Sequence, residues 1–269
     1  MKQIRTLRAE LFLFILFVMG SLNARGQEKL ILFGGGGYTP TAVQKFVEWA
    51  GGRDAKILIV PWATDNPDYE FDEVKEVLSP HKTSKVVKGL SPDEKGFNKS
   101  ELLTQIDEAT GIFFPGGDQV DLMERINRNP EVRQSFLNAY HRGIVIAGFS
   151  AGTAMASKTM ITGHGDFTQI APKNVETAEG LGLVTEFVVD QHFIARQRQN
   201  RLISVLQVSR ENFGLGIDEK MALIVEDGLR TTALGPSYVM VFHRLNSSKK
   251  FKITLLQNGE TLTIPSKPQ

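Results

Sequence analysis

The chain contains no cysteine among its 269 residues. Disulfide bonds, thiolate catalysis, cysteine-based metal sites and lipid attachment through a cysteine are therefore excluded. The sequence also lacks an H-E-x-x-H pattern and any close pair of histidines on a helix, so we do not expect a metal ion. An exported protein without disulfides depends on its hydrophobic core, and a chain of this length can supply one.

Apolar runs long enough to cross a membrane are missing as well. The run at residues 11–19 has nine residues, whereas a spanning helix needs about 20. Basic residues precede this run and small residues follow it, which is the arrangement of a secretory signal peptide. We predict a signal peptide over residues 1–26, cleaved after Gly26, and an exported protein that is periplasmic or secreted. An uncleaved N-terminal anchor is the alternative.

The sequence has no excess charge of either sign. Removal of residues 1–26 takes away four basic residues and one acidic residue, which leaves 27 basic and 29 acidic residues. This balance gives no reason to expect nucleic acid or an anionic membrane as a partner. Repeats, low-complexity tracts and long linkers are absent too, so residues 27–269 are predicted to form a single domain without a stable membrane span.

Short apolar runs alternate with amphipathic segments along most of this domain. Strands are expected at residues 29–33, 56–60, 84–87, 111–114 and 143–147, and helices at 41–50, 69–78, 99–106, 120–127 and 130–140. The alternation predicts an α/β fold with a mostly parallel sheet flanked by helices, whose functional site lies at the carboxyl ends of the strands. Near the C-terminus, Asn258-Gly259 between residues 251–256 and 261–264 predicts a β-hairpin.

A G-x-S-x-G sequence at residues 148–152 directly follows the apolar run 143–147. A buried strand that turns sharply into a helix at such a motif is a nucleophile elbow, and it presents the Ser150 hydroxyl as a candidate nucleophile. The alternative is a glycine-rich turn with an incidental serine. A second glycine run, at residues 34–37, does not fit the dinucleotide-binding spacing because Thr39 stands at its third glycine position, so we expect a tight turn near the site.

A serine nucleophile needs a general base, which is usually a histidine. His192 follows the apolar strand that ends at Asp190, at the edge of the sheet where the site of an α/β protein lies. His164 lies in a glycine-containing loop and is a further candidate. His243 would be the base if the chain were instead an esterase of the α/β-hydrolase type.

Three arginines follow the candidate base, at positions 196, 198 and 201. Arginine binds carboxylates through two parallel hydrogen bonds, so Arg196, Arg198 and Arg201 indicate an acidic substrate, unless they form a solvated helix face. A helix is expected at residues 196–208, and the i, i+3 spacing would place Arg198 and Arg201 on one face of it. The glycines at 116–117 suit an oxyanion hole, and Gln119 is placed to bind a substrate amide or carboxylate. The alternative there is a turn with Asp118 as a helix cap.

Taken together, these segments resemble cyanophycinase and aspartyl dipeptidase, also called peptidase E. The resemblance rests on an ordered series of segments over roughly residues 30–230, namely 116–119, 148–152, 159–161, 180–183, 190–193, the three arginines and 214–218. It implies a class I glutamine-amidotransferase-like α/β fold and cofactor-independent cleavage of β-aspartyl-arginine peptide bonds. It further implies Ser150 as nucleophile, His192 as base and the N–H groups of Gly117 and Ala151 as oxyanion donors. Gln119 and the three arginines would bind an acidic or β-aspartyl peptide, and the assembly would be a homodimer.

The chain departs from this pattern at the third member of the triad. The resemblance leads us to expect a glutamate in the loop after the nucleophile helix, but the loop 163–169 contains none. Asp166 is the nearest acid and our candidate, with Glu176 and Glu179 farther along. If no acid reaches His192, the chain would be a relative that binds acidic peptides without cleaving them.

Overall fold

The computed structural model describes residues 27–246 and 249–266, so the predicted signal peptide lies outside the described residues. The helices are α2 (Pro40–Trp49), α3 (Pro67–Leu78), α4 (Lys99–Glu108), α5 (Gln119–Asn127), α6 (Pro130–His141), α7 (Ala151–Ala154) and α8 (Gln199–Val208), with short 3₁₀ turns at Gly52–Asp54, Ser79–His81 and Pro172–Asn174. The first seven strands are β1 (Lys29–Phe33), β2 (Lys56–Ile59), β3 (Lys85–Lys88), β4 (Gly111–Phe114), β5 (Val145–Phe149), β6 (Thr159–Gly165) and β7 (Val175–Glu179). The others are β8 (Phe187–Asp190), β9 (Phe213–Ile217), β10 (Ala222–Glu226), β11 (Arg230–Leu234), β12 (Val239–Arg244), β13 (Phe251–Leu256) and β14 (Thr261–Thr263).

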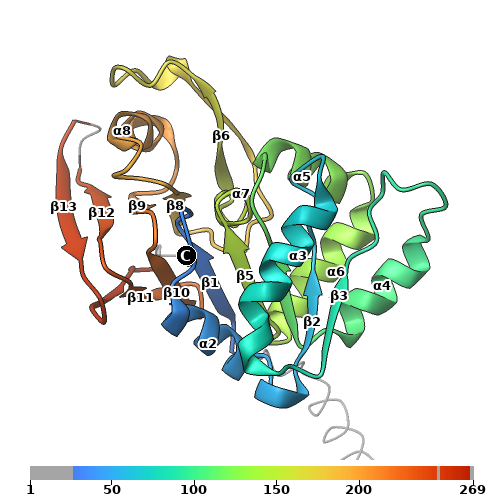
Figure 1. Cartoon of the computed structure of the whole chain (residues 1–269). Coiled ribbons are helices and arrows are strands. Elements are labelled where there is room, and N and C mark those ends of the chain that lie inside the picture. The colour runs from blue at the N-terminus through green and yellow to red at the C-terminus, as the bar shows by residue number, and fades with distance from the viewer. Residues whose placement is uncertain (1–26, 247–248, 267–269) are drawn as a thin grey trace, which may run out of the picture.

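The largest sheet has eight strands in the order β14-β11-β10-β1-β5-β4-β2-β3. The pairs from β1 through β5, β4 and β2 to β3 are all parallel, and β10, β11 and β14 extend the sheet with antiparallel pairs. Parallel strands are joined by crossover helices that cover both faces, which is why β1, β2, β4 and β5 are almost continuously apolar. The α/β fold with a mostly parallel sheet flanked by helices is therefore confirmed, as Figure 1 shows.

Helices cover the sheet on both faces. One core cluster contains the buried side chains of α2 and α3, such as Phe46 and Val74. Another core cluster contains those of α4 and α6, such as Leu102 and Phe136. Five of the helices, α2 to α6, begin at a side-chain cap or at a proline in their first turn. For example, the carboxylate of Asp118 accepts the N–H of Val120 at 2.7 Å and caps α5, which confirms the capping interpretation of that residue.

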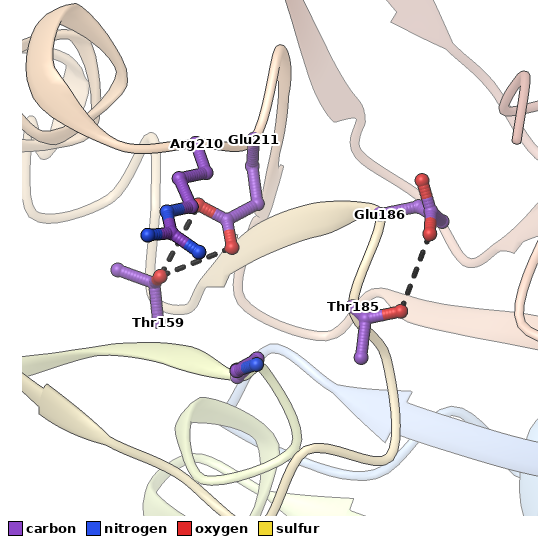
Figure 2. Close-up of a pocket in the computed structure, with 6 residues that line it drawn as sticks. Thr159, Thr185, Glu186, Arg210 and Glu211 are labelled. Atoms are coloured by element: carbon purple, nitrogen blue, oxygen red, sulfur yellow. Dashed lines mark hydrogen bonds between the residues drawn. The ribbon is translucent and has the colours of Figure 1, made fainter. Parts of the chain in front are cut away.

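A second sheet lies beside the first and has the order β13-β12-β9-β8. Its β8 and β9 are parallel, whereas the other pairs are antiparallel. The segments that follow β8 and β9 hydrogen-bond to the loop after β1, from the N–H of His192 to Gly34 at 2.7 Å and from that of Lys220 to Gly35 at 2.8 Å. The candidate active site lies at this junction of the two sheets. Residues that precede β8 and β9 line a small cavity, drawn in Figure 2. Among the described residues, no helix combines the length and apolar character that crossing a membrane requires.

The predicted C-terminal β-hairpin is wrong, although both of its strands exist. The strand β13 pairs with β12 in the second sheet, whereas β14 pairs with β11 in the first sheet. Gly259 does adopt a turn conformation with a φ of 82°, but its N–H donates to Ala233 of the first sheet at 2.7 Å. The turn signal is local, and the open edges of two different sheets compete for the strands on either side of it.

Candidate active site

Ser150 occupies a strained turn between β5 and α7. Its φ of 51° and ψ of −102° lie outside the regions that residues with a side chain normally adopt, and its N–H donates to the carbonyl of Phe33 at 3.2 Å. The flanking glycines are sterically required, because a Cβ on Gly148 would lie 2.2 Å from the carbonyl oxygen of Gly152. A Cβ on Gly152 would in turn lie 2.1 Å from the carbonyl oxygen of Phe114. The sequence motif thus forms the sharp turn that presents the serine hydroxyl.

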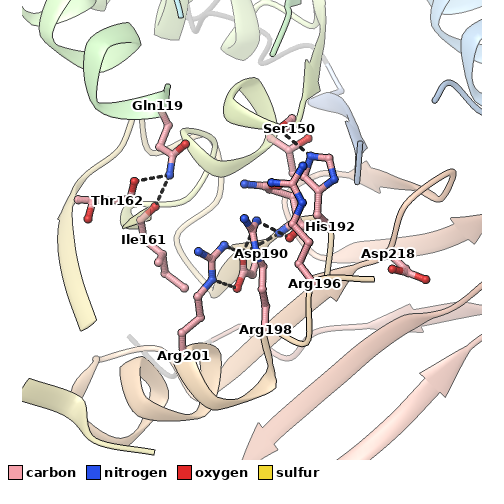
Figure 3. Close-up of polar contacts among 12 residues, drawn as sticks. Gln119, Ser150, Ile161, Thr162, Asp190, His192, Arg196, Arg198, Arg201 and Asp218 are labelled. Atoms are coloured by element: carbon pink, nitrogen blue, oxygen red, sulfur yellow. Dashed lines mark hydrogen bonds and ion pairs between the residues drawn. The ribbon is translucent and has the colours of Figure 1, made fainter. Parts of the chain in front are cut away.

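His192 lies beside this hydroxyl. Its Nε2 is 3.0 Å from Oγ of Ser150, a hydrogen-bond distance at which the ring can accept the hydroxyl proton (Figure 3). Its backbone N–H donates to the carbonyl of Gly34 at 2.7 Å, and its φ is 48°, so the loop after β8 holds the ring at this position. The structure brings the predicted nucleophile and base together. By contrast, the ring of His243 is stacked on Phe213 in the second sheet, with centroids 4.2 Å apart.

The carboxylate that contacts His192 belongs to Glu219, not to Asp166. Oε1 of Glu219 is 2.6 Å from Nδ1 of His192, and the side chain of His192 is only 8% exposed. Asp166 is instead exposed, and its Oδ1 accepts the N–H and the hydroxyl hydrogen of Thr168 at 2.9 and 2.6 Å. The prediction of Asp166 as the third residue of the triad is therefore wrong. The alternative of a non-catalytic relative was based on a missing acid, and an acid does reach His192.

The two other acids considered for this position lie on the exposed strand β7. The carboxylate of Glu176 is 3.9 Å from Nδ1 of His164, and that of Glu179 is 3.3 Å from a guanidinium nitrogen of Arg133. Glu219 follows β9, directly after the segment 214–218 that already pointed to the family. Its position two residues beyond a buried strand, at the same sheet edge as His192, is the signal that could have identified it.

The glycine run at residues 34–37 makes room for the histidine–glutamate pair. A Cβ on Gly35, whose φ is 99°, would lie 2.2 Å from Cε1 of His192. A Cβ on Gly36 would lie 2.5 Å from Oε2 of Glu219. The prediction of a tight turn near the site is confirmed, and the glycines let the backbone pack directly against both side chains.

Asp218 connects the loop after the histidine to the segment that carries the glutamate. Its Oδ1 accepts the N–H groups of Ile194 and Ala195 at 3.0 and 2.9 Å, and its Oδ2 accepts the hydroxyl of Ser237 at 2.6 Å. Three hydrogen bonds to one partly buried carboxylate fix these loops relative to each other. The base and its acid are therefore held on one rigid frame.

The pKa of His192 is lowered from its ordinary value. Burial of the ring is the largest cause, and the positive charges of Arg196 and Arg198 add to it. The hydrogen bond to Glu219 opposes this shift. A lowered pKa keeps the ring neutral at neutral pH, and the carboxylate favours the tautomer with hydrogen on Nδ1. Nε2 is then free to accept a proton from the serine.

The three arginines differ in their burial and in their contacts. Arg201 is 1% exposed and forms a two-pronged ion pair with the equally buried carboxylate of Asp190, through Nε at 2.7 Å and through a second nitrogen. Its predicted role as a substrate ligand is wrong, because its guanidinium is already engaged inside the protein. The helix α8 begins only at Gln199, so the shared helix face expected for Arg198 and Arg201 does not form.

Arg196 and Arg198 lie closer to the reacting groups. Arg198 donates to the carbonyl of Gln191 at 2.8 Å, and burial lowers its pKa to about 10, so it stays charged at neutral pH. The side chain of Arg196 is 54% exposed, and its Nε is 3.9 Å from the carboxylate of Glu219. Of the three, Arg196 presents the most accessible guanidinium beside the triad (Figure 3).

Gln119 is the first residue of α5, and the two predicted oxyanion donors, Gly117 and Ala151, follow β4 and β5 of the first sheet. The amide nitrogen of Gln119 donates to the carbonyls of Ile161 and Thr162 at 2.9 and 2.6 Å, so this side chain also anchors β6. Ala151 is the first residue of α7, where an N–H has no acceptor within the helix. Gly117 has a φ of 130°, and a Cβ there would lie 1.9 Å from the carbonyl oxygen of Ala63.

The sequence model of peptidase family S51 matches residues 30–232. The chain belongs to peptidase family S51. It is 31% identical over 196 residues to a cyanophycinase from Synechococcus elongatus, a match that covers 73% of this chain and 61% of that protein. It is 30% identical to a cyanophycinase from Geminocystis herdmanii, with 74% of this chain and 73% of the relative covered. A peptidase E from Streptomyces coelicolor is 28% identical, with 52% of each chain covered.

Two solved structures share the fold of this S51 member. A peptidase from an acI-B1 actinobacterium superposes with a TM-score of 0.70 at 20% identity, covering 89% of this chain and 97% of the other. A putative peptidase E protein from Listeria monocytogenes gives a TM-score of 0.57 at 17% identity, covering 79% and 100%. These likenesses support the α/β architecture with a mostly parallel sheet flanked by helices.

Gln191, like Glu219, was not singled out from the sequence. Gln191 stands between Asp190 and His192 and is 5% exposed, yet its Oε1 has no hydrogen-bond partner among the described residues. A buried carbonyl oxygen without a donor is costly, so this oxygen stands out among the groups next to His192. Its place between two residues that were singled out was the available signal.

Proposed function

We propose that the protein is a serine-type peptidase that hydrolyses peptide bonds formed by the β-carboxyl group of aspartate, with arginine as the preferred partner residue. The observation that carries the proposal is the chain of contacts from Ser150 through His192 to Glu219, at 3.0 and 2.6 Å. Membership of peptidase family S51 and the similarity to proteins named cyanophycinase support the same reaction class. The match spans only 61% of the length of the Synechococcus cyanophycinase, so the extension of that protein's activity to this chain is part of the proposal.

In the proposed mechanism, Oγ of Ser150 attacks the scissile carbonyl while Nε2 of His192 takes its proton. The negative charge of Glu219 stabilises the imidazolium that forms. The N–H groups of Gly117 and Ala151 stabilise the negatively charged oxygen of the tetrahedral intermediate. His192 then gives its proton to the leaving amine. Water hydrolyses the acyl-enzyme by the reverse sequence of proton transfers.

The polar groups around the serine favour a substrate with a free carboxylate. Arg196 offers an accessible guanidinium next to the triad, and a carboxylate is the anion that its planar fork binds best. A β-linked aspartyl residue carries its free α-carboxylate close to the scissile bond, which fits the position of this guanidinium.

The test compares two dipeptides that differ only in linkage. β-Asp-Arg and α-Asp-Arg are incubated with the wild-type protein and with Ser150→Ala, and the released arginine is measured. We expect cleavage of the β-linked peptide by the wild-type protein alone. Cleavage of the α-linked peptide with equal kcat/KM would refute the substrate assignment, and turnover by Ser150→Ala would refute the mechanism.

We also propose that residues 1–26 direct export and are removed after Gly26. The support is the sequence arrangement alone, since these residues lie outside the described part of the chain. Mass spectrometry of the protein recovered from its native compartment tests this proposal. We expect an N-terminus at Gln27, and an intact N-terminus in a membrane fraction would favour an uncleaved anchor.

A further inference from the structure

A small cavity lies at the end of β8 and β9 opposite to the candidate active site. Glu186 directly precedes β8 and Glu211 precedes β9, whereas His192 and Glu219 follow the same two strands. At about 3.3 Å per residue, the six residues from Glu186 to His192 span about 20 Å. The cavity therefore cannot be a part of the catalytic cleft.

Charged groups of both signs surround this cavity of about 330 Å³ (Figure 2). Its lining consists of two basic, two acidic and two hydroxyl side chains, namely Lys158, Arg210, Glu186, Glu211, Thr159 and Thr185. Small-molecule sites have volumes of about 300–1,000 Å³, so this cavity suits a compact ligand. Such a ligand would have to present both a positive and a negative group.

The buried acid of this lining, Glu211, is incompletely satisfied. The residue is 4% exposed, and within the described part of the chain its two carboxylate oxygens share a single donor, the hydroxyl of Thr159, at 3.1 Å from each. One hydroxyl has one hydrogen, so one oxygen is left without a donor at any moment. The salt bridges of the described residues do not include Glu211. Buried carboxylates are normally paired with a cation, so the cavity lacks a positive group at this point.

The positive side of the cavity is supplied by Arg210 and Lys158, both exposed to solvent. Neither takes part in a salt bridge within the described ranges 27–246 and 249–266. The described residues also contain no group of three or more His, Asp or Glu side chains that could hold a metal ion. An organic ammonium group therefore suits Glu211 better than a metal ion does.

We propose that this cavity is a second binding site, separate from the catalytic centre, for a small zwitterion of the α-amino-acid class. The ammonium group donates to Glu211 and Thr159, and the carboxylate contacts Arg210 and Lys158. Lys158 and Arg210 follow different elements, so the ligand bridges the segment after α7 and the segment after α8. The site holds its ligand at the amino ends of the strands that carry the base and the acid of the triad.

The experiment titrates three probes into the purified protein by calorimetry. The probes are L-alanine, N-acetyl-L-alanine without an ammonium group, and L-alaninamide without a carboxylate. Each is tested on the wild-type protein, on Glu211→Gln and on Arg210→Ala, whose exposed position leaves folding intact. Arg196→Ala is the matched control, because it removes an arginine beside the catalytic centre. Amide chemical shifts of residues 158–159, 185–186 and 210–211 locate the bound probe.

We expect saturable binding of L-alanine, weaker by about tenfold or more for either blocked probe and for either cavity variant, because each loses one charge-assisted contact. Arg196→Ala should bind L-alanine as the wild-type protein does. Absence of saturable binding to the wild-type protein would overturn the proposal. Equal affinity for the blocked probes would also overturn it. So would L-alanine binding that is lost in Arg196→Ala but retained in Arg210→Ala.

Discussion

Replacement of Glu219 by glutamine tests the central contact of the site. In the ground state His192 is neutral, and it becomes an imidazolium as the serine loses its proton, so the attraction to the carboxylate arises in the transition state. The side chain of Glu219 is 33% exposed, so the effective dielectric constant of a partly exposed pair is appropriate. With charge centres about 4 Å apart and a dielectric constant of about 20, this attraction is about 4 kcal/mol. Glu219→Gln should therefore lower kcat by about 10³-fold.

The assay is hydrolysis of the β-Asp-Arg dipeptide, with circular dichroism and thermal unfolding to verify the fold. Asp166→Asn is the matched control, since Asp166 was the acid expected from the sequence and is exposed in the structure. We expect this variant to retain full activity. If Glu219→Gln kept more than about a tenth of kcat, or if Asp166→Asn lost as much as Glu219→Gln, the assignment of the third residue would fail.

Three further predictions follow from the same geometry. Gly35→Ala places a Cβ 2.2 Å from the ring of His192, so kcat should fall by about 10²-fold or more while circular dichroism stays unchanged; full activity would contradict the packing argument. The lowered pKa of His192 places the acid limb of the kcat/KM profile at a lower pH than an ordinary histidine would give. Arg196→Ala should move this limb to higher pH, because the loss of a positive charge favours the imidazolium, and a shift to lower pH would contradict this reasoning. Arg201→Met removes the two-pronged partner of the buried Asp190 carboxylate and leaves it only the longer contact with Arg198 at 3.9 Å. Urea unfolding should therefore show a loss of about 3 kcal/mol, against about 0.5 kcal/mol or less for Arg196→Ala.

The features that the sequence predicted correctly depend on local patterns. Apolar runs between amphipathic segments identified the parallel strands, and a strand that ends in G-x-S-x-G placed Ser150 at the carboxyl edge of the sheet. His192 was found in the same way, by its place after an apolar strand. In each case the chemistry-bearing residue and the element that positions it are neighbours in the chain.

The features that were missed depend on which distant segments meet. The strands β13 and β14 have the composition of a hairpin, yet each completes a different sheet. Arg201 belongs to the arginine-rich segment that was expected to bind substrate, yet its charge is paired with the carboxylate of Asp190 in the adjacent strand. Glu219 lies 27 residues from the histidine that it contacts. Nothing in the local sequence distinguishes a free arginine from a buried one, and the choice among several acids depends on which strand ends come together in the fold.

The end of β1 explains how residues from two sheets form one site. Three consecutive carbonyls at residues 33–35 accept the N–H groups of Ser150 at 3.2 Å, His192 at 2.7 Å and Lys220 at 2.8 Å. One short loop thus sets the positions of the nucleophile, of the base and of the residue next to the acid. Side chains at positions 35 and 36 would collide with the base and the acid, so only glycine lets the backbone serve as this common support. The glycine run that lacks a dinucleotide-binding spacing is therefore the element that aligns the three members of the site.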